Sequence, residues 1–186
     1  PQTLYAISKY AGERVALRMG ELFKIRVLNV RWSAIFGRWE YDTGVRDTLS
    51  APMQATLLAL KGETALIDRK EERDWTYSRD VARALYKLAN HENVNSSLYN
   101  ISSGKTWSVF DWCALLKMSY PDFNYRLCEF GEVPNIDLFG ARDRIKMSPD
   151  RFLCDIGYTL SADLNEIFED FKIWLTGSNG FWNLEP

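Results

Sequence analysis

A phenol and an ammonium group lie four residues apart near the start of the chain, at Tyr5 and Lys9. In a helix, this spacing places both side chains on one face, about one turn apart. A phenol has an unperturbed pKa of about 10, so it is a poor base at neutral pH unless a nearby cation stabilises the phenolate. Lys9 can supply that cation, which makes the pair a candidate acid/base couple for a substrate hydroxyl. The spacing alone is a weak signal, because about 0.4 such pairs are expected by chance.

The segment around this pair has the pattern of a long helix followed by a strand. Apolar and small residues recur at helical spacing from residue 4 to about residue 23, with polar side chains between them. Residues 26–32 are rich in branched side chains, which is typical of a strand in a buried sheet. We predict that a loop follows at residues 33–44.

Strands and helices alternate along the rest of the chain. Helices are predicted over residues 47–61, 80–90, 149–156 and 162–175, with one more after Ser108, and strands at residues 64–67, 75–77, 97–101 and 125–128. Ser108 and Asp111 have the form of a capping box, and Ser148, Pro149 and Gly157 have the form of helix start and stop signals. This order predicts an α/β protein with parallel strands covered by helices.

Composition limits the classes of function. The 186 residues are 46% apolar, which is enough for one sizeable core. A formal net charge of -2 leaves no basic excess for a phosphate backbone, so we predict no nucleic-acid partner. No apolar stretch approaches the roughly 20 residues that span a bilayer, so no membrane contact is predicted. The three dispersed cysteines and His91 indicate neither a disulfide framework nor a metal site, and a cytoplasmic location is expected.

Five segments in order carry a family resemblance. The Tyr-x-x-Ser-Lys-x-x-x-Glu sequence at residues 5–13, with a strand ending at Arg31, resembles the catalytic helix and next strand of extended short-chain dehydrogenases. Four later segments are similar to motifs of the same group, the NAD-dependent epimerase/dehydratase family: residues 31–37, 73–82, 99–104 and 142–157. The resemblance extends from Tyr5 to Trp174. Two positions depart from the family pattern, since Ala34 stands where Asn is frequent and Arg38 replaces the usual Pro.

On the coenzyme side, the resemblance assigns roles to three residues. Tyr5 would be the acid/base that takes or gives the hydroxyl proton while hydride passes to or from a nicotinamide. Lys9 would hold the nicotinamide ribose and lower the pKa of Tyr5. Ser33 would contact the nicotinamide.

On the substrate side, Arg73 and Arg144 would clamp phosphates, for which the planar and permanently charged guanidinium is suited. Ala34 would line the substrate. Simpler interpretations stay open for both arginines: Arg73 could form a surface ion pair with Asp74, and Arg144 could lie in a solvated loop. Asp80 is more typical of a helix cap than of a catalytic acid.

The fold implied by the resemblance is the C-terminal part of a Rossmann-type parallel sheet with its helices, plus a small α/β substrate domain. Residues 1–45 and 64–105 would belong to the sheet, residues 46–63 and 106–176 mainly to the substrate domain, and residues 177–186 to a tail. The glycines never form the G-x-x-G-x-x-G or G-x-G-x-x-G turn that binds a dinucleotide. The Ser/Thr that usually joins Tyr and Lys is also missing.

We therefore interpret the chain as the C-terminal portion of an enzyme that uses NAD or NADP. Its substrate would be a sugar or nucleotide sugar, and its epimerase, dehydratase or dehydrogenase reaction would begin with oxidation of a substrate hydroxyl. The chain alone is predicted to be inactive. A homodimer is expected, because a bare edge of parallel strands favours association. The alternative is a non-catalytic truncated paralogue that acts as an interaction or substrate-binding module.

Overall fold

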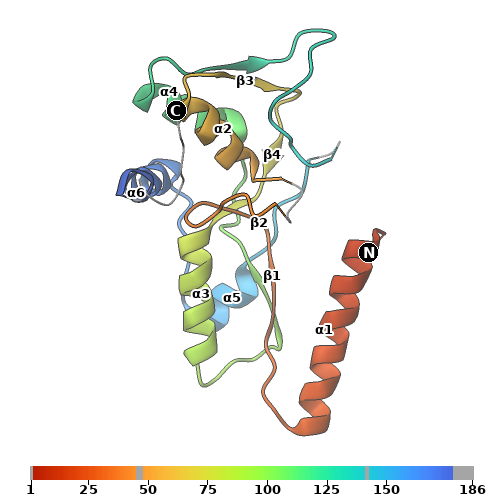
Figure 1. Ribbon diagram of the computed structural model, residues 1–186. Coiled ribbons are helices and arrows are strands. Elements are labelled where there is room, and N and C mark those ends of the chain that lie inside the picture. Colours follow the sequence, from red (N-terminus) through yellow and green to blue (C-terminus); the bar gives the residue numbers. More distant parts are fainter. Residues whose placement is uncertain (1, 45–47, 141–142, 178–186) are drawn as a thin grey trace.

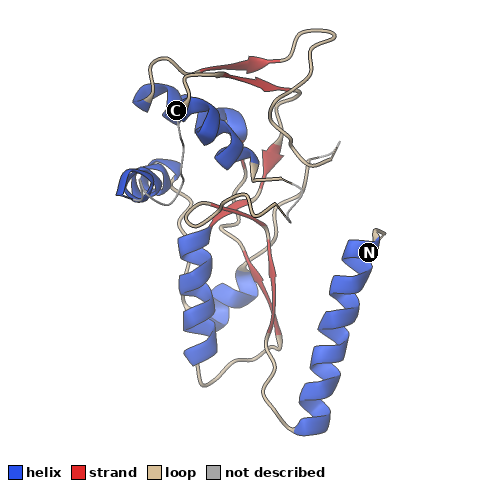
Figure 2. Cartoon of the chain, viewed as in Figure 1, coloured by secondary structure: helices blue, strands red, loops and turns tan. Residues whose placement is uncertain are grey.

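The computed structural model describes residues 2–44, 48–140 and 143–177 of the chain. Its elements in order are α1 (Leu4–Phe23), β1 (Asn29–Trp32), β2 (Ala34–Phe36), α2 (Ala51–Leu60), β3 (Thr64–Ile67), β4 (Glu72–Arg73), β5 (Trp75–Tyr77), α3 (Ser78–Asn90), β6 (Leu98–Ile101), β7 (Trp107–Ser108), α4 (Val109–Ser119), β8 (Asn124–Leu127), α5 (Asp150–Ile156) and α6 (Leu164–Gly177). Strand pairs β1/β6, β2/β5 and β3/β8 are parallel, and β4/β7 is antiparallel. Helices lie beside these pairs (Figure 1). The predicted α/β class with parallel strands is confirmed (Figure 2).

The predicted loop at residues 33–44 is wrong in its first part, where the chain forms strand β2. This strand pairs in parallel register with β5, and the Ala34 N–H also donates to the Asp74 carbonyl at 3.1 Å. A strand of three residues has little local signal of its own. It exists because β5, far along the chain, supplies its hydrogen-bond partners.

Buried apolar side chains form two clusters. The larger lies among α2, α4 and α6 and includes Phe36 and Trp112, and the smaller lies among α3, α5 and β6 and includes Tyr99 and Phe152. Helix α1 stands apart at one side of the lower half of the molecule, facing β1 (Figure 1). The division into sheet and substrate domain drawn from the sequence stays a prediction.

Helix ends match the sequence signals at α4 and shift at α3 and α5. The Ser108 N–H donates to Asp111 Oδ2 at 2.8 Å, as the capping box requires. Helix α5 begins one residue later than predicted, with Pro149 as its N-cap. Helix α3 begins before Asp80, so this residue lies in the first turn instead of capping it, and its buried carboxylate accepts from the Ser161 N–H at 3.2 Å. None of the described helices is both long and apolar enough to cross a bilayer.

Gly37, directly after β2, is expected to tolerate no side chain. Its φ is +119°, and an added Cβ would lie 2.4 Å from Cε2 of the buried Tyr77 ring. Backbone strain and overpacking act together, so Gly37→Ala should lower the free energy of unfolding by about 3 kcal/mol or more. Gly131→Ala is the matched control, because its φ is +88° and an added Cβ meets no atom within 4 Å. It should cost only about 1 kcal/mol. Equal losses in urea unfolding would contradict a role for the ring contact.

Candidate active site

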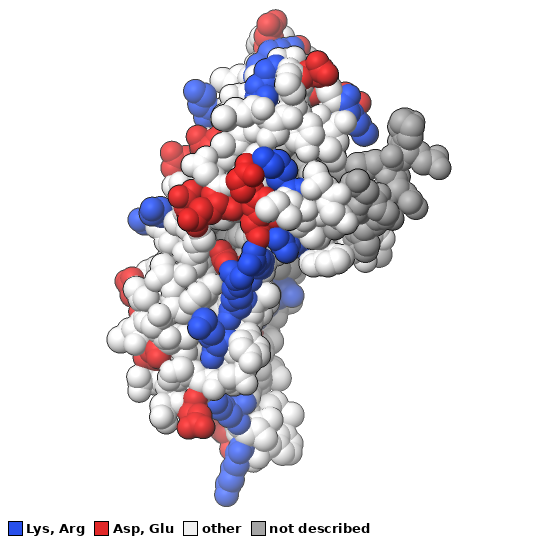
Figure 3. All heavy atoms as spheres, turned by 90° about the vertical axis from the view of Figure 1, so that its left-hand side faces the viewer, with Lys and Arg blue, Asp and Glu red and all other residues white. Residues whose placement is uncertain are grey.

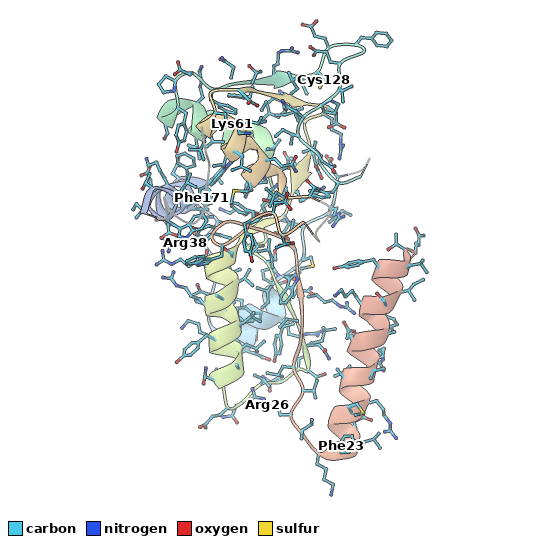
Figure 4. All side chains as sticks on the ribbon, viewed as in Figure 1. Phe23, Arg26, Arg38, Lys61, Cys128 and Phe171 are labelled. Atoms are coloured by element: carbon cyan, nitrogen blue, oxygen red, sulfur yellow. The ribbon has the colours of Figure 1, made fainter. Side chains whose placement is uncertain are left out.

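A cavity of about 1420 Å³ lies between α1 and the first parallel strands. Its wall comes from α1, β1, β2 with the loop after it, β5 and the segment before α5. All six residues that the sequence singled out contribute to this wall: Tyr5, Lys9, Ser33, Ala34, Arg73 and Arg144. Side chains of α1 and β1 project into the space between these two elements (Figure 4). Residues that are far apart in the sequence therefore meet at one cavity.

Tyr5 and Lys9 lie one turn apart on α1, and the Lys9 Nζ is 5.3 Å from the centre of the Tyr5 ring. The register of the helix is set at its start, where the Thr3 hydroxyl accepts from the Ala6 N–H at 3.1 Å. Tyr5 is 72% exposed in this chain. The Lys9 ammonium therefore lies over the ring of Tyr5, and the exposed phenol is accessible to a substrate.

Helix α1 is joined to β1 by an ion pair that sequence reasoning did not identify. The Arg31 guanidinium donates from Nε and Nη2 to the two carboxylate oxygens of Glu13, each at 2.8 Å. This hydrogen bonding raises the pKa of Arg31. Both residues line the cavity, so the pair holds the helix that carries Tyr5 against the strand opposite. Glu13 belongs to the motif at residues 5–13, but its partner 18 positions away is not visible from local pattern.

Ser33 and Ala34 lie where the strand order passes from β1 to β2. The Ser33 hydroxyl forms a short hydrogen bond with the Thr76 hydroxyl, and its N–H donates to the Ile101 carbonyl at 3.4 Å. Ala34 presents only a methyl group. The side chains at these two positions therefore offer the cavity little free hydrogen-bonding capacity.

Arg73 is buried, and its ion-pair partner is Glu71. The sequence interpretation of a surface pair with Asp74 is wrong: the Arg73 and Glu71 side chains are 4% and 2% exposed. Nε donates to Glu71 Oε1 at 2.8 Å, while Nη2 donates to the same oxygen and to the Leu138 carbonyl. The guanidinium carbon lies 5.1 Å from the centre of the Trp75 ring. Burial raises the pKa of Glu71, and the hydrogen bond from Arg73 opposes that rise.

Asp74 has a different task, which the sequence did not reveal. Its buried carboxylate accepts from the Ser102 hydroxyl at 2.6 Å and from the Met147 N–H at 2.9 Å. Met147 lies three residues after Arg144, so this bond fixes the segment that brings Arg144 to the cavity. Arg144 itself is exposed, and Arg142 of the same predicted motif lies outside the described residues.

The loop after β2 is tied to α6 through Asp170. Arg38 Nη2 lies 2.6 Å from Asp170 Oδ1, and the Tyr77 hydroxyl donates to Oδ2 at 2.8 Å. Arg79 of α3 also pairs with this carboxylate. Burial raises the pKa of Tyr77, so the phenol stays protonated and donates. In Figure 4, Arg38 lies between α3 and α6. Arg38, which replaces the proline of the family pattern, therefore holds the loop by an ion pair.

Charges are mixed on the face that carries α3 and α6. Basic side chains run along α3 and acidic ones gather near α6 (Figure 3). The residues concerned are Arg79, Arg83 and Lys87 on α3, and Glu166, Glu169 and Asp170 on α6. Within the described part of the chain, no group of three or more His, Cys, Asp or Glu side chains is placed to hold a metal ion.

Comparison with protein families identifies the chain. The model of the NAD dependent epimerase/dehydratase family matches residues 1–102, more than half of the sequence. The chain belongs to this family. The matched range includes five of the six candidate residues and ends before Arg144.

The chain is also similar to one relative in sequence and to solved structures in fold. A provisionally assigned UDP-glucose 4-epimerase of Methanocaldococcus jannaschii is 29% identical over 119 residues, which are 63% of this chain and 37% of that protein. The dTDP-glucose 4,6-dehydratase of Bacillus anthracis, solved with NAD, has a TM-score of 0.73 at 15% identity, over 98% of this chain and 55% of that one. The UDP-glucose 4-epimerase of Thermotoga maritima, solved with UDP-glucose, has a TM-score of 0.70 at 19% identity, over 94% and 54%. The chain thus spans about half the length of its structural relatives.

The family name implies a nicotinamide coenzyme, and the residues present fit part of one. Lys9 offers a cation and Tyr5 a hydroxyl on a cavity that is large enough for a coenzyme and a substrate together. The glycine-rich turn that would hold the diphosphate of the coenzyme is not among these residues. The cavity wall thus includes groups suited to the nicotinamide end of such a coenzyme.

Proposed function

We propose that this chain forms the catalytic and substrate-binding half of an NAD(P)-dependent sugar or nucleotide-sugar epimerase, dehydratase or dehydrogenase. One observation carries the proposal: Tyr5, Lys9, Arg73 and Arg144 line a single cavity. Membership of the family supports it. Further support comes from two structural relatives, one solved with NAD and the other with UDP-glucose.

Tyr5 acts on the proton of the substrate hydroxyl. Its phenolate accepts that proton while the hydrogen on the same carbon leaves as hydride, and it returns the proton when the reaction runs backwards. Lys9 stabilises the phenolate from one turn along the helix and binds the ribose next to the nicotinamide. The coenzyme, when bound, supplies the hydride acceptor.

On the opposite wall of the cavity, Arg144 and Arg73 hold the part of the substrate that does not react. Arg144 is exposed, and its segment is fixed by the bond between the Met147 N–H and Asp74. Arg73 reaches the cavity from β4 with its orientation set by Glu71. Holding the remote group keeps the reacting hydroxyl beside Tyr5.

The decisive test is conversion by a polypeptide that carries this chain behind a dinucleotide-binding half. It is incubated with NAD or NADP and a panel of sugars, sugar acids and nucleotide sugars, and the products are followed by NMR. Coenzyme-dependent conversion of any panel member supports the proposal. Saturable binding without any conversion favours the non-catalytic module instead.

The 186-residue chain alone should neither convert substrate nor bind the coenzyme. Because it lacks the glycine-rich turn, a fluorescence titration with NADH is expected to show no saturation. Saturation at micromolar concentration would mean that the coenzyme site is completed in another way, most simply across a dimer.

We extend the proposal to a homodimer in which α1 takes part. Several apolar side chains of α1 are exposed, among them Leu4 at 86%, Phe23 at 62% and Val15 at 61%. Apolar surface of this kind on one helix is typical of an interface. Sedimentation velocity of the polypeptide with both halves tests this, and a monomer at all concentrations would contradict it.

A further inference from the structure

A pair of charges behind the cavity wall affects what the cavity can bind. Arg73 lines the cavity, whereas its partner Glu71 is not among the lining residues and contacts Arg73 from the protein side. Both side chains are almost completely buried. An anion that enters the cavity therefore meets Arg73 with Glu71 already bound to it.

The hydrogen bonds of Arg73 leave it unable to grip a phosphate with two nitrogens. A guanidinium binds phosphate most strongly through two parallel N–H groups. Here Nε donates to Glu71 Oε1, and the two hydrogens of Nη2 are directed at Glu71 Oε1 and the Leu138 carbonyl. Only Nη1 makes no hydrogen bond with a residue that the structure describes. Of the three nitrogens of Arg73, Nη1 alone can therefore donate to a substrate anion.

The charges around this pair do not restore an excess of positive charge. Arg69 Nη2 lies 3.5 Å from Glu71 Oε2, but Arg69 is also 3.2 Å from a carboxylate oxygen of Asp68 and 3.8 Å from one of Asp143. Two guanidinium groups thus face three carboxylates in this cluster. Of the two arginines predicted to clamp phosphates, only Arg144 forms no ion pair with a residue that the structure describes.

We infer that Glu71 is a specificity-determining residue, which neutralises Arg73 and so favours substrates with at most one negative charge at this point over diphosphates. The inference rests on the proposed function, and it deepens it by naming the substrate class. A sugar carboxylate matches the single charge of Arg144. A diphosphate, with one more negative charge close to the buried Glu71 carboxylate, is repelled because the interaction is poorly screened in a buried site.

The test compares the binding of UDP-glucose by the 186-residue chain and by Glu71→Gln, measured by calorimetry. The glutamine keeps the shape and an oxygen that accepts from Arg73, but it removes the charge. Affinity for UDP-glucose should rise about tenfold or more. Glu132→Gln is the matched control, since it makes the same change in net charge at an exposed pair with Arg126 away from the cavity. Its affinity should equal that of the unchanged chain.

A second measurement needs no variant, and it decides the question if Glu71→Gln does not fold. Burial raises the pKa of Glu71 against the opposing effects of Arg73 and Arg69, with Asp143 adding to the rise. Lowering the pH from neutral into the acidic range in which Glu71 takes up its proton should therefore strengthen UDP-glucose binding. The diphosphate diester keeps its charge over this range.

Each outcome bears on the inference in a defined way. A gain in Glu71→Gln together with a pH-dependent gain in the unchanged chain supports it. Equal affinity for UDP-glucose in Glu71→Gln and in the unchanged chain overturns the inference. If the variant does not fold, the absence of any gain in affinity at lower pH overturns it. Neither result bears on the proposed reaction. If no chain binds UDP-glucose at either pH, both the role of Glu71 and a nucleotide-sugar substrate are wrong. Failure of the proposed function itself is seen separately, as absence of conversion across the substrate panel.

Discussion

Replacing Tyr5 with phenylalanine is expected to lower kcat about a thousandfold in the polypeptide with both halves, with substrate affinity nearly unchanged. The variant keeps the ring beside Lys9, whose Nζ lies 5.3 Å from the ring centre, and removes only the hydroxyl that accepts the substrate proton. A loss confined to kcat is the signature of an interaction made in the transition state. Steady-state rates and a binding titration on the same preparation separate the two quantities.

Tyr86→Phe is the matched control for this experiment. Tyr86 is 72% exposed, as Tyr5 is, but it lies on α3 and not on the cavity wall. The same loss of a hydroxyl should there leave kcat unchanged. If Tyr5→Phe keeps more than about a tenth of the activity, another group moves the proton and the assignment of Tyr5 is wrong.

The parts of the candidate site that depend on residues close together in the sequence could be predicted. Tyr5 and Lys9 share one helix, and their spacing alone predicts that they lie on one face, where Lys9 Nζ indeed lies over the Tyr5 ring. The capping box at Ser108 follows from the same kind of short-range rule and is confirmed. Residues that act within one turn of helix need no knowledge of the rest of the fold.

The partner of Arg73 could also have been predicted from the sequence, by strand geometry instead of by adjacency. In extended chain, adjacent side chains point to opposite faces and alternate ones share a face. Arg73 therefore faces the same way as Glu71, and Asp74 points to the other side, where Ser102 and Met147 meet it. Adjacency in sequence suggested Asp74, whereas strand geometry selects Glu71.

Other features depend on contacts between distant segments and had no local signal. Strand β2 exists because β5 lies beside it. The ion pair between Arg38 and Asp170 likewise joins two residues that are far apart in the sequence. The sequence marked Arg38 only as a departure from the family proline. Its role in holding the loop after β2 depends on Asp170 of α6, whose position beside Arg38 is set by the fold.

The largest loss of stability is expected from Trp112→Ala, at about 4 to 5 kcal/mol in the free energy of unfolding. Trp112 is completely buried and its ring meets those of Phe36, Trp107, Phe168 and Phe171 at centroid distances of 5.2, 5.9, 5.1 and 5.4 Å. Its Nε1–H donates to the Thr56 hydroxyl at 3.0 Å. Removing the ring leaves a cavity where three helices meet, and the hydroxyl loses a donor.

Two further variants divide this loss into its causes. Trp112→Phe keeps most of the packing and loses the hydrogen bond, so it should cost about 1 to 2 kcal/mol. Met118→Ala, on the same helix but 81% exposed, should stay within about 0.5 kcal/mol. Chemical denaturation of all three variants gives the comparison.

Because Phe36 joins this aromatic cluster to the cavity wall, Trp112→Ala should also weaken substrate binding, whereas Met118→Ala should not. If Trp112→Ala unfolds as readily as Met118→Ala, the cluster does not hold α2, α4 and α6 together, and the support proposed for the cavity wall is wrong.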